Sequence, residues 1–197
     1  MGERLTDLIL LRAKVNGDAK RALDIGQQLK FDHQNGFQEI IATYNADTAD
    51  LYVYFYLKEP SKLALLDAQS FLQNIYVSLS YVELSRIAFL NPIKGYSENQ
   101  VPSNRYVVEM DPELGWMEEL FDWYDQEHLP GLANVPGCVR AIRCLNLDHS
   151  PYSYAFYDLT STNVLGCEAW LKVRHTAWSD RVRPHFTNTK RTMFEFI

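Results

Sequence analysis

A repeated order of strands and helices limits how this chain can fold more than any other feature of its sequence. In the first half, Asp18 follows a turn and precedes a run of helix-forming residues, so it predicts the N-cap of a helix. Pro60-Ser61 predicts the start of a second helix. Segments rich in β-branched and aromatic residues predict four strands, at residues 8–15, 37–44, 51–57 and 86–93. The order is strand, helix, two strands, helix, strand.

The second half repeats this order. Asp111-Pro112-Glu113 combines a capping residue, an N1 proline and an early acid, which predicts a helix that ends at Pro130-Gly131. Residues 161–163 predict the start of the other helix. The four predicted strands are residues 105–110, 138–147, 152–159 and 191–197. The chain therefore contains the βαββαβ order twice.

Local matches between the halves favour a tandem duplication. Arg86-Ile-Ala-Phe89 matches Arg191-Thr-Met-Phe194 at an offset of 105 residues, and 37–44 matches 138–145 at an offset of 101. A βαββαβ unit is the split-βαβ or ferredoxin-like arrangement, in which two helices cover one face of a four-stranded antiparallel sheet. Because the other face is bare, we expect an α+β protein whose two units pack sheet to sheet as an α/β barrel. The alternative is that two α+β domains share a strand order by chance.

The predicted domains are residues 1–97, as a degenerate repeat with a scaffold role, and residues 104–197, as the repeat that holds a pocket. The polar stretch between them contains Pro102 and predicts the junction. The two halves could complete one barrel within the chain, which would give a monomer with an internal pseudo-dimer, or each chain could pair again as a homodimer.

Composition excludes several classes of protein. The 197 residues are 47% hydrophobic and 13% aromatic, which is enough apolar surface for a folded core. A net charge of −6 argues against nucleic-acid binding, and the longest apolar run near the N-terminus, residues 8–11, is too short to cross a membrane. We therefore expect a cytoplasmic protein.

Cys138, Cys144 and Cys167 lack metal-ligand spacing, and we expect them to be reduced, structural cysteines. No metal-binding or nucleotide-binding motif is present, so we expect neither a metal nor a cofactor.

One segment of the second half carries residues suited to chemistry. At 100° per residue, Tyr124 and His128 lie on one face of the predicted helix, and Trp123 and Glu127 lie on the neighbouring face. The structural alternative is that His128 only caps the helix C-terminus. The corresponding residues of the first half are Gln27 and Gln28, which cannot titrate. This asymmetry predicts one pocket, in the second half.

The pattern W-Y-x-x-E-H-x-P followed by V-P-G, inside a βαββαβ unit, resembles the dimeric α/β-barrel superfamily and most closely its EthD-like branch. The match is tightest over residues 122–143. Relatives include cofactor-free polyketide cyclases, muconolactone isomerases, small quinol-forming monooxygenases, and the haem-binding chlorite dismutase and dye peroxidase groups. The resemblance implies a pocket between helices and sheet, with His128 as general base or acid.

Neighbouring residues suggest partners for this histidine. Tyr124 could donate a hydrogen bond to a carbonyl that becomes an enolate, and Glu127 could orient polar groups. Arg143 could hold a substrate carboxylate, or it could pair with Glu127 or Asp158, and we favour the structural role. The other predicted substrate-binding residues are Trp123, Tyr154, Tyr157, His175 and Trp178. Tyr154 and Tyr157 point to opposite faces of their strand, so only one of them can face the helices.

Three functions are compatible with these residues. The leading hypothesis is a cofactor-independent lyase, isomerase or cyclase that does acid–base chemistry on a small aromatic or hydrophobic carbonyl compound. The second is a monooxygenase of phenolic substrates, either cofactor-free or haem-dependent. The third is a barrel that binds a small apolar molecule without catalysis.

Overall fold

The structure, a computed structural model, describes residues 4–64 and 79–197. The chain divides into two compact units. Unit 1 comprises Met1–Ala88, Asn146–His149 and Phe194–Ile197, and unit 2 comprises Phe89–Leu145 and Ser150–Met193.

The chain passes from one unit to the other inside two long strands, β4 (Leu79–Lys94) and β8 (Phe186–Phe196). The sequence prediction had placed the junction after residue 97. In the structure, Gly95 and Ser97 donate backbone hydrogen bonds to the carbonyl groups of Val139 and Cys138, respectively. The polar stretch after Ser97 also belongs to unit 2, where the backbone N–H of Ser103 donates a hydrogen bond to the carbonyl oxygen of Leu159.

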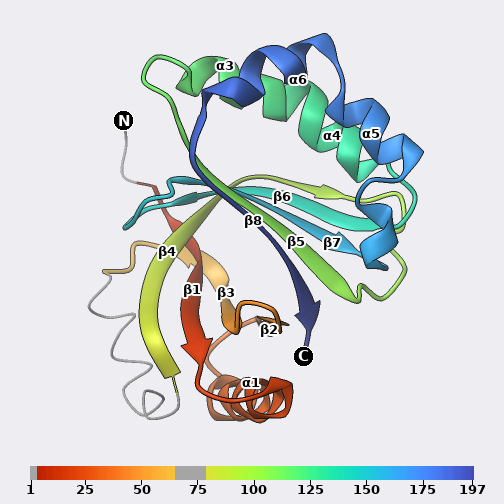
Figure 1. Cartoon of the computed structure of the whole chain (residues 1–197). Helices are drawn as coiled ribbons and strands as arrows, with labels where there is room; N and C mark the ends of the chain where they lie inside the picture. Colours follow the sequence, from red (N-terminus) through yellow and green to blue (C-terminus); the bar gives the residue numbers. More distant parts are fainter. Residues whose placement is uncertain (1–3, 65–78) are drawn as a thin grey trace. The chain divides into compact units, whose positions relative to one another are not determined.

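Unit 1 contains β1 (Thr6–Val15), α1 (Ala19–His33), β2 (Glu39–Asn45) and β3 (Asp50–Ser61). Its strands pair antiparallel in the order β4-β1-β3-β2, and the end of β8 pairs with β2. Helix α1 packs against these strands (Figure 1) through residues that include Ala22 and Leu29. The predicted N-cap is confirmed, because Asp18 Oδ1 accepts a hydrogen bond of 3.0 Å from the backbone N–H of Arg21.

Unit 2 contains three further strands, β5 (Asn104–Pro112), β6 (Cys138–Asn146) and β7 (Ser153–Leu159). They pair antiparallel in the order β8-β5-β7-β6, and β4 continues beside β6. Helical segments lie on one face of this sheet (Figure 1). They are α3 (Met117–Trp123), the π-helical turn η2 (Tyr124–His128), α4 (Leu129–Ala133), the 3₁₀ turn η3 (Thr162–Val164), α5 (Glu168–Arg174), α6 (Ala177–Val182) and the 3₁₀ turn η4 (Arg183–His185).

Both units thus show the strand order of the ferredoxin-like arrangement, and the predicted α+β class is confirmed. The three cysteines form no disulfide bond, as the sequence predicted. No helix among residues 4–64 and 79–197 is long and apolar enough to cross a membrane.

Several predicted helix boundaries were wrong. Strand β3 continues through Pro60-Ser61, and the remainder of the helix predicted there lies outside the described residues. Strand β5 continues through Pro112, and the next helix begins only at Met117. Tertiary pairing extends both strands over residues whose local chemistry favours a helix start. The helix predicted to start at residues 161–163 begins only at Glu168. Ser161 instead precedes a single 3₁₀ turn, Thr162–Val164.

Pro130-Gly131 also failed to end a helix. Instead, α3, η2 and α4 follow one another without a break, and Pro130 occupies the first turn of α4. A proline is tolerated there because its missing N–H and bulky ring are accommodated where the α-helical ladder is already interrupted. The helical segment therefore runs beyond His128, so this residue does not cap a helix C-terminus.

Candidate active site

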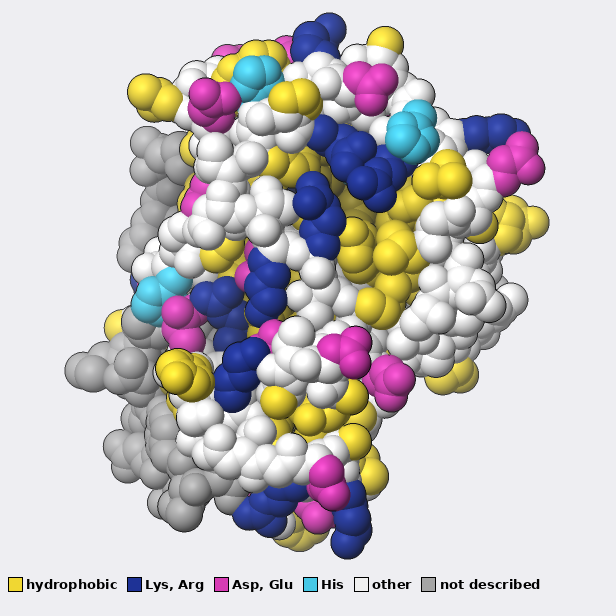
Figure 2. All heavy atoms as spheres, in the orientation of Figure 1, with side chains coloured by type: hydrophobic (Ala, Val, Ile, Leu, Met, Phe, Trp, Pro, Cys, Tyr) yellow, Lys and Arg dark blue, Asp and Glu magenta, His cyan; other side chains and the backbone are white. Residues whose placement is uncertain are grey.

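Unit 2 contains a hollow between its helical segments and its sheet. Its cavity volume is about 30 Å³, and the atom-free space including the open mouth is about 390 Å³. In Figure 2, Lys and Arg side chains gather beside a hollow floored by hydrophobic side chains. The lining residues are mostly aromatic or basic: Tyr106, Val108, Trp123, Tyr124, His128, Leu132, Tyr157, Trp170, Arg174, Arg183, Phe186 and Arg191.

The π-helical turn positions the histidine of this hollow. The backbone N–H of Leu129 donates to the carbonyl oxygen of Tyr124, five residues earlier, instead of four as in an α-helix. The wider turn brings residues five apart over one another. As a result, the rings of Trp123 and His128 stack, with centroids 4.1 Å apart and planes inclined by 21°. The α-helical spacing had predicted Glu127 beside Trp123, and the structure replaces it with His128.

His128 is a neutral base in this environment. Its side chain is 9% exposed, and the edge of Tyr124 lies against it with ring centroids 5.5 Å apart. Burial, reinforced by the positive charges of Arg183 and Arg174, lowers the pKa of His128 from 6.5 to about 3. At neutral pH the imidazole is therefore uncharged and able to accept a proton. The Nδ1 atom of His128 has no hydrogen-bond partner among the described residues.

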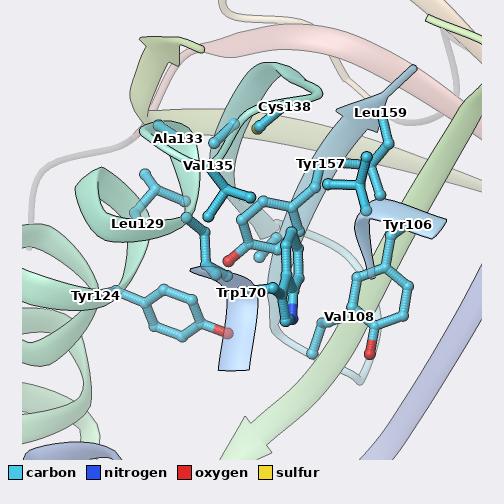
Figure 3. Close-up of a cluster of buried hydrophobic side chains, with 14 of the residues drawn as sticks. Tyr106, Val108, Tyr124, Leu129, Ala133, Val135, Cys138, Tyr157, Leu159 and Trp170 are labelled. Carbon is cyan, nitrogen blue, oxygen red and sulfur yellow. The ribbon is translucent and has the colours of Figure 1, made fainter. Parts of the chain in front are cut away.

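The tyrosines of the hollow are hydrogen-bond donors. Burial raises the pKa of Tyr124 to about 12 and that of Tyr157 well above 10, so both hydroxyl groups stay protonated. Figure 3 shows Tyr124 extending from the helical segment toward Tyr157 and Trp170. No described residue bonds to the Tyr157 hydroxyl or to Trp123 Nε1. These buried polar atoms in a cavity are available to a bound molecule.

Three arginines line the same hollow. They are Arg174 at the end of α5, Arg183 in η4 and Arg191 in β8. Burial and the charges of the other two lower the pKa of Arg183. Sequence reasoning missed these residues as site components. Their spacing along the chain carries no motif that could have linked them.

The structure distinguishes the two tyrosines of β7. Tyr157 faces the helices and lines the hollow, whereas Tyr154 faces the other side of the sheet, where its ring lies 5.9 Å from that of Phe156. The alternation of side chains along a strand required one of them to do so.

Arg143 is fully buried but does not line the hollow. Its guanidinium lies over the ring of Phe121, 3.9 Å from the centroid, and over that of Tyr124, at 4.6 Å. Its nearest carboxylate is that of Asp125, at 3.7 Å, so the expected pairing with Glu127 or Asp158 was wrong. Burial lowers the pKa of Arg143. Through these contacts Arg143 packs against the ring of Tyr124, which fits the structural role favoured from the sequence.

Glu127, His175 and Trp178 also lie outside the residues that line the hollow. Glu127 accepts a hydrogen bond from the Thr176 hydroxyl, which joins η2 to the start of α6. Trp178 donates from Nε1 to Glu119, at 2.8 Å. His175 is exposed at the end of α5. No group of three or more metal-ligating side chains occurs within residues 4–64 and 79–197.

Comparison with known proteins identifies the fold. No family model and no curated protein matches the sequence. Among solved structures, a protein assigned as a monooxygenase from Fusobacterium nucleatum subsp. nucleatum superposes with a TM-score of 0.67 at 10% identity, over 99% of this chain and 94% of that one. An anthrone oxidase-like protein gives 0.61 at 11% identity, over 98% and 92%. A chlorite dismutase from Candidatus Nitrospira defluvii gives 0.62 at 12% identity, over 96% and 92%. At these identities the likeness establishes a shared ferredoxin-like fold.

Proposed function

We propose that this protein is a cofactor-independent monooxygenase of a phenolic or similarly acidic aromatic substrate. The observation that carries the proposal is a neutral, buried histidine that faces an aromatic hollow under a positive potential. Such a site suits a substrate that is neutral when it binds and becomes an anion by losing a proton. An electron-rich aromatic anion can pass an electron to dioxygen without help from a metal or flavin.

In the proposed reaction, His128 accepts a proton from an acidic C–H or O–H group of the substrate. Its low pKa makes it a weak base in the free protein, but the substrate anion beside it would stabilise the imidazolium. Tyr124 and Tyr157 would donate hydrogen bonds to the oxygen on which negative charge develops. The cavity of about 30 Å³ has room for a molecule the size of water or dioxygen.

The products follow from atom balance. For a methylene group activated by neighbouring rings, proton loss and electron transfer to dioxygen allow a C–O bond to form. Loss of water from the resulting hydroperoxide then leaves a carbonyl. One CH₂ group and one O₂ molecule thus give one C=O group and one molecule of water.

A haem cofactor fits the residues of this hollow poorly. A ligating histidine normally donates its second ring N–H to an acceptor that fixes its orientation, and no described residue serves His128 Nδ1 in this way. The ring of His128 is itself stacked on that of Trp123. We therefore derive no step through haem.

The names of the similar structures support the oxygenase over the lyase, isomerase or cyclase hypothesis, because they include monooxygenase and anthrone oxidase-like proteins. The same His128–Tyr124 pair could serve proton transfer alone, so the reaction has to be tested directly. Membership of the EthD-like branch and an origin by tandem duplication are part of the proposal. The first is supported by the motif around His128, and the second by the strand order common to both units.

The test measures oxygen uptake by the purified protein with 1,8-dihydroxyanthrone or a naphthohydroquinone as substrate. The products are identified by mass spectrometry. We expect one O₂ consumed per substrate, with a loss of about 10²- to 10⁴-fold in His128→Gln. His175→Gln, an exposed histidine outside the hollow, is the matched control.

Each other outcome identifies a different function. An isomerised or cyclised product without oxygen uptake would replace the proposal with the acid–base hypothesis. Binding without any product, unchanged in His128→Gln, would indicate a non-catalytic binding protein. Full activity in His128→Gln would show that His128 is not the catalytic base.

A further inference from the structure

Two arginines of the hollow, Arg174 and Arg183, differ from the other arginines of comparable burial. Each other buried or half-buried arginine in the described part of the chain lies within 4 Å of a carboxylate. These pairs are Arg12 with Glu83, Arg86 with Asp148, Arg105 and Arg140 with Asp158, and Arg143 with Asp125. Arg174 and Arg183 are half-buried, and neither they nor Arg191 has an ion pair with a described residue.

The three positive charges interact with one another. Arg174 and Arg191 both disfavour the charged form of Arg183, and Asp180 compensates this only as the smallest of the contributing charges. All three also act on the hydroxyl of Tyr106, which lines the same hollow. A chain with a net charge of −6 thus gathers three cations from three separate elements around one cavity. Their mutual repulsion is a cost that a bound anion would relieve.

The transient anion of the proposed reaction does not balance this charge. Proton transfer from the substrate to His128 creates one anion and one imidazolium cation, so the net charge of the site is unchanged and the three guanidinium groups keep their excess positive charge. A second, permanent negative charge on the ligand would reduce the imbalance. The planar guanidinium fork matches the geometry of a carboxylate, with two parallel N–H···O bonds.

The rest of the hollow suits an aromatic ring. The aromatic side chains that line it include Trp123, Tyr157 and Trp170. An apolar body with one fixed charged group is the arrangement that specific small-molecule sites commonly recognise.

We propose that the ligand of this hollow is an aromatic carboxylic acid, whose ring enters the aromatic cavity and whose carboxylate binds Arg183 together with Arg174 and Arg191 at its mouth. This inference rests on the proposed function only in identifying the ligand with the substrate. The binding site itself follows from the unpaired arginines and the cavity.

The test measures equilibrium binding by isothermal titration calorimetry under nitrogen, where oxygenation cannot occur. The probes are benzoate, 2-naphthoate and 2-anthroate, each compared with its neutral amide. We expect the acid that fits best to bind at least tenfold more tightly than its amide, and this advantage to shrink as the salt concentration rises.

Variants locate the carboxylate. Arg183→Gln is expected to weaken binding of that acid by about tenfold, while binding of the amide changes less than twofold. Arg191→Gln is expected to act in the same direction, and because Arg191 is exposed its replacement leaves the core intact. The matched control is Arg181→Gln, since Arg181 pairs with Glu119 outside the hollow and should not affect binding of the acid.

The proposal is overturned if no acid of the panel binds more tightly than its amide. It is also overturned if Arg191→Gln and Arg183→Gln leave the preference unchanged, or if Arg181→Gln reduces it equally. Because binding is measured without turnover, arginine-dependent binding combined with absent oxygen uptake would refute the oxygenase alone. Oxygen uptake that is indifferent to the arginines would refute only the carboxylate site.

Discussion

Acidification is expected to destabilise this protein through His128. In the folded chain the pKa of His128 is lowered from 6.5 to about 3, chiefly by burial. An unfolded chain binds a proton at this residue below pH 6.5, whereas the folded chain does not until the pH approaches 3. Between these values the unfolded state holds more protons, so the free energy of unfolding rises with pH. The contribution is complete above pH 6.5 and is lost progressively as the pH falls toward 3.

The size of the effect follows from the difference between the two pKa values. Each pH unit in this window corresponds to about 1.36 kcal/mol. At pH 5, which lies about 1.5 units below the unfolded pKa, the loss is about 2 kcal/mol. Such a loss is a large fraction of the 5–15 kcal/mol that stabilises a typical domain, so it is readily measured.

The assay is urea unfolding at pH 7 and pH 5 for the wild-type protein and for His128→Phe. Phenylalanine keeps an aromatic ring against Trp123 but cannot titrate. Between pH 7 and pH 5, the wild-type free energy of unfolding should fall by about 2 kcal/mol more than that of His128→Phe, because other titrating groups cancel in the comparison. His175→Gln should behave like wild type. If the wild type and His128→Phe lose stability in parallel, His128 is not a buried neutral residue and the reasoning fails.

Three other predictions concern the backbone, a buried ion pair and the reaction. Gly137 has a φ of +93°, and a Cβ added to it would lie 2.4 Å from a methyl group of Val164. Gly137→Ala should therefore lower the free energy of unfolding by about 1–3 kcal/mol. Thermal unfolding measures this loss, and an unchanged Tm would contradict the prediction. Arg105→Met should lower the free energy of unfolding in urea by about 3–5 kcal/mol, because buried Asp158 loses hydrogen bonds of 2.6 and 3.0 Å. A loss below about 1 kcal/mol would show that Arg140 alone is enough to pair with the Asp158 carboxylate. The pH profile of kcat/KM should lack an acid limb near 6.5, since the pKa of His128 is about 3; a limb there would assign the proton to a different group or to a solvated histidine.

The π-helical turn shows why local patterns predicted the site only in part. The sequence placed Tyr124 and His128 on one helix face, and both do line the hollow. It placed Trp123 with Glu127, because an α-helical period was assumed. One π turn changes which residues lie over one another, and it stacks Trp123 on His128 instead. The turn depends on how the segment from α3 to α4 packs on the sheet, which periodicity does not reveal.

The strand order was predictable because it depends on information that is local in the sequence. Runs of β-branched and aromatic residues, turn residues and the Asp18 cap each identify an element, and their repeated order leaves few topologies for an antiparallel sheet. Helix starts at Pro60-Ser61 and Asp111-Pro112 were mispredicted, since strand pairing with neighbours outweighed the local preference.

The sequence by itself determined the α+β class, the strands of both units and the helical segment that carries Tyr124 and His128. Only the tertiary structure decided that Tyr157 and not Tyr154 faces the hollow, because both faces of β7 are buried and hydrophobicity cannot distinguish them. It also decided that three arginines meet there. Arg174, Arg183 and Arg191 belong to different elements, and charges separated along the chain act together only when folding brings them to one cavity.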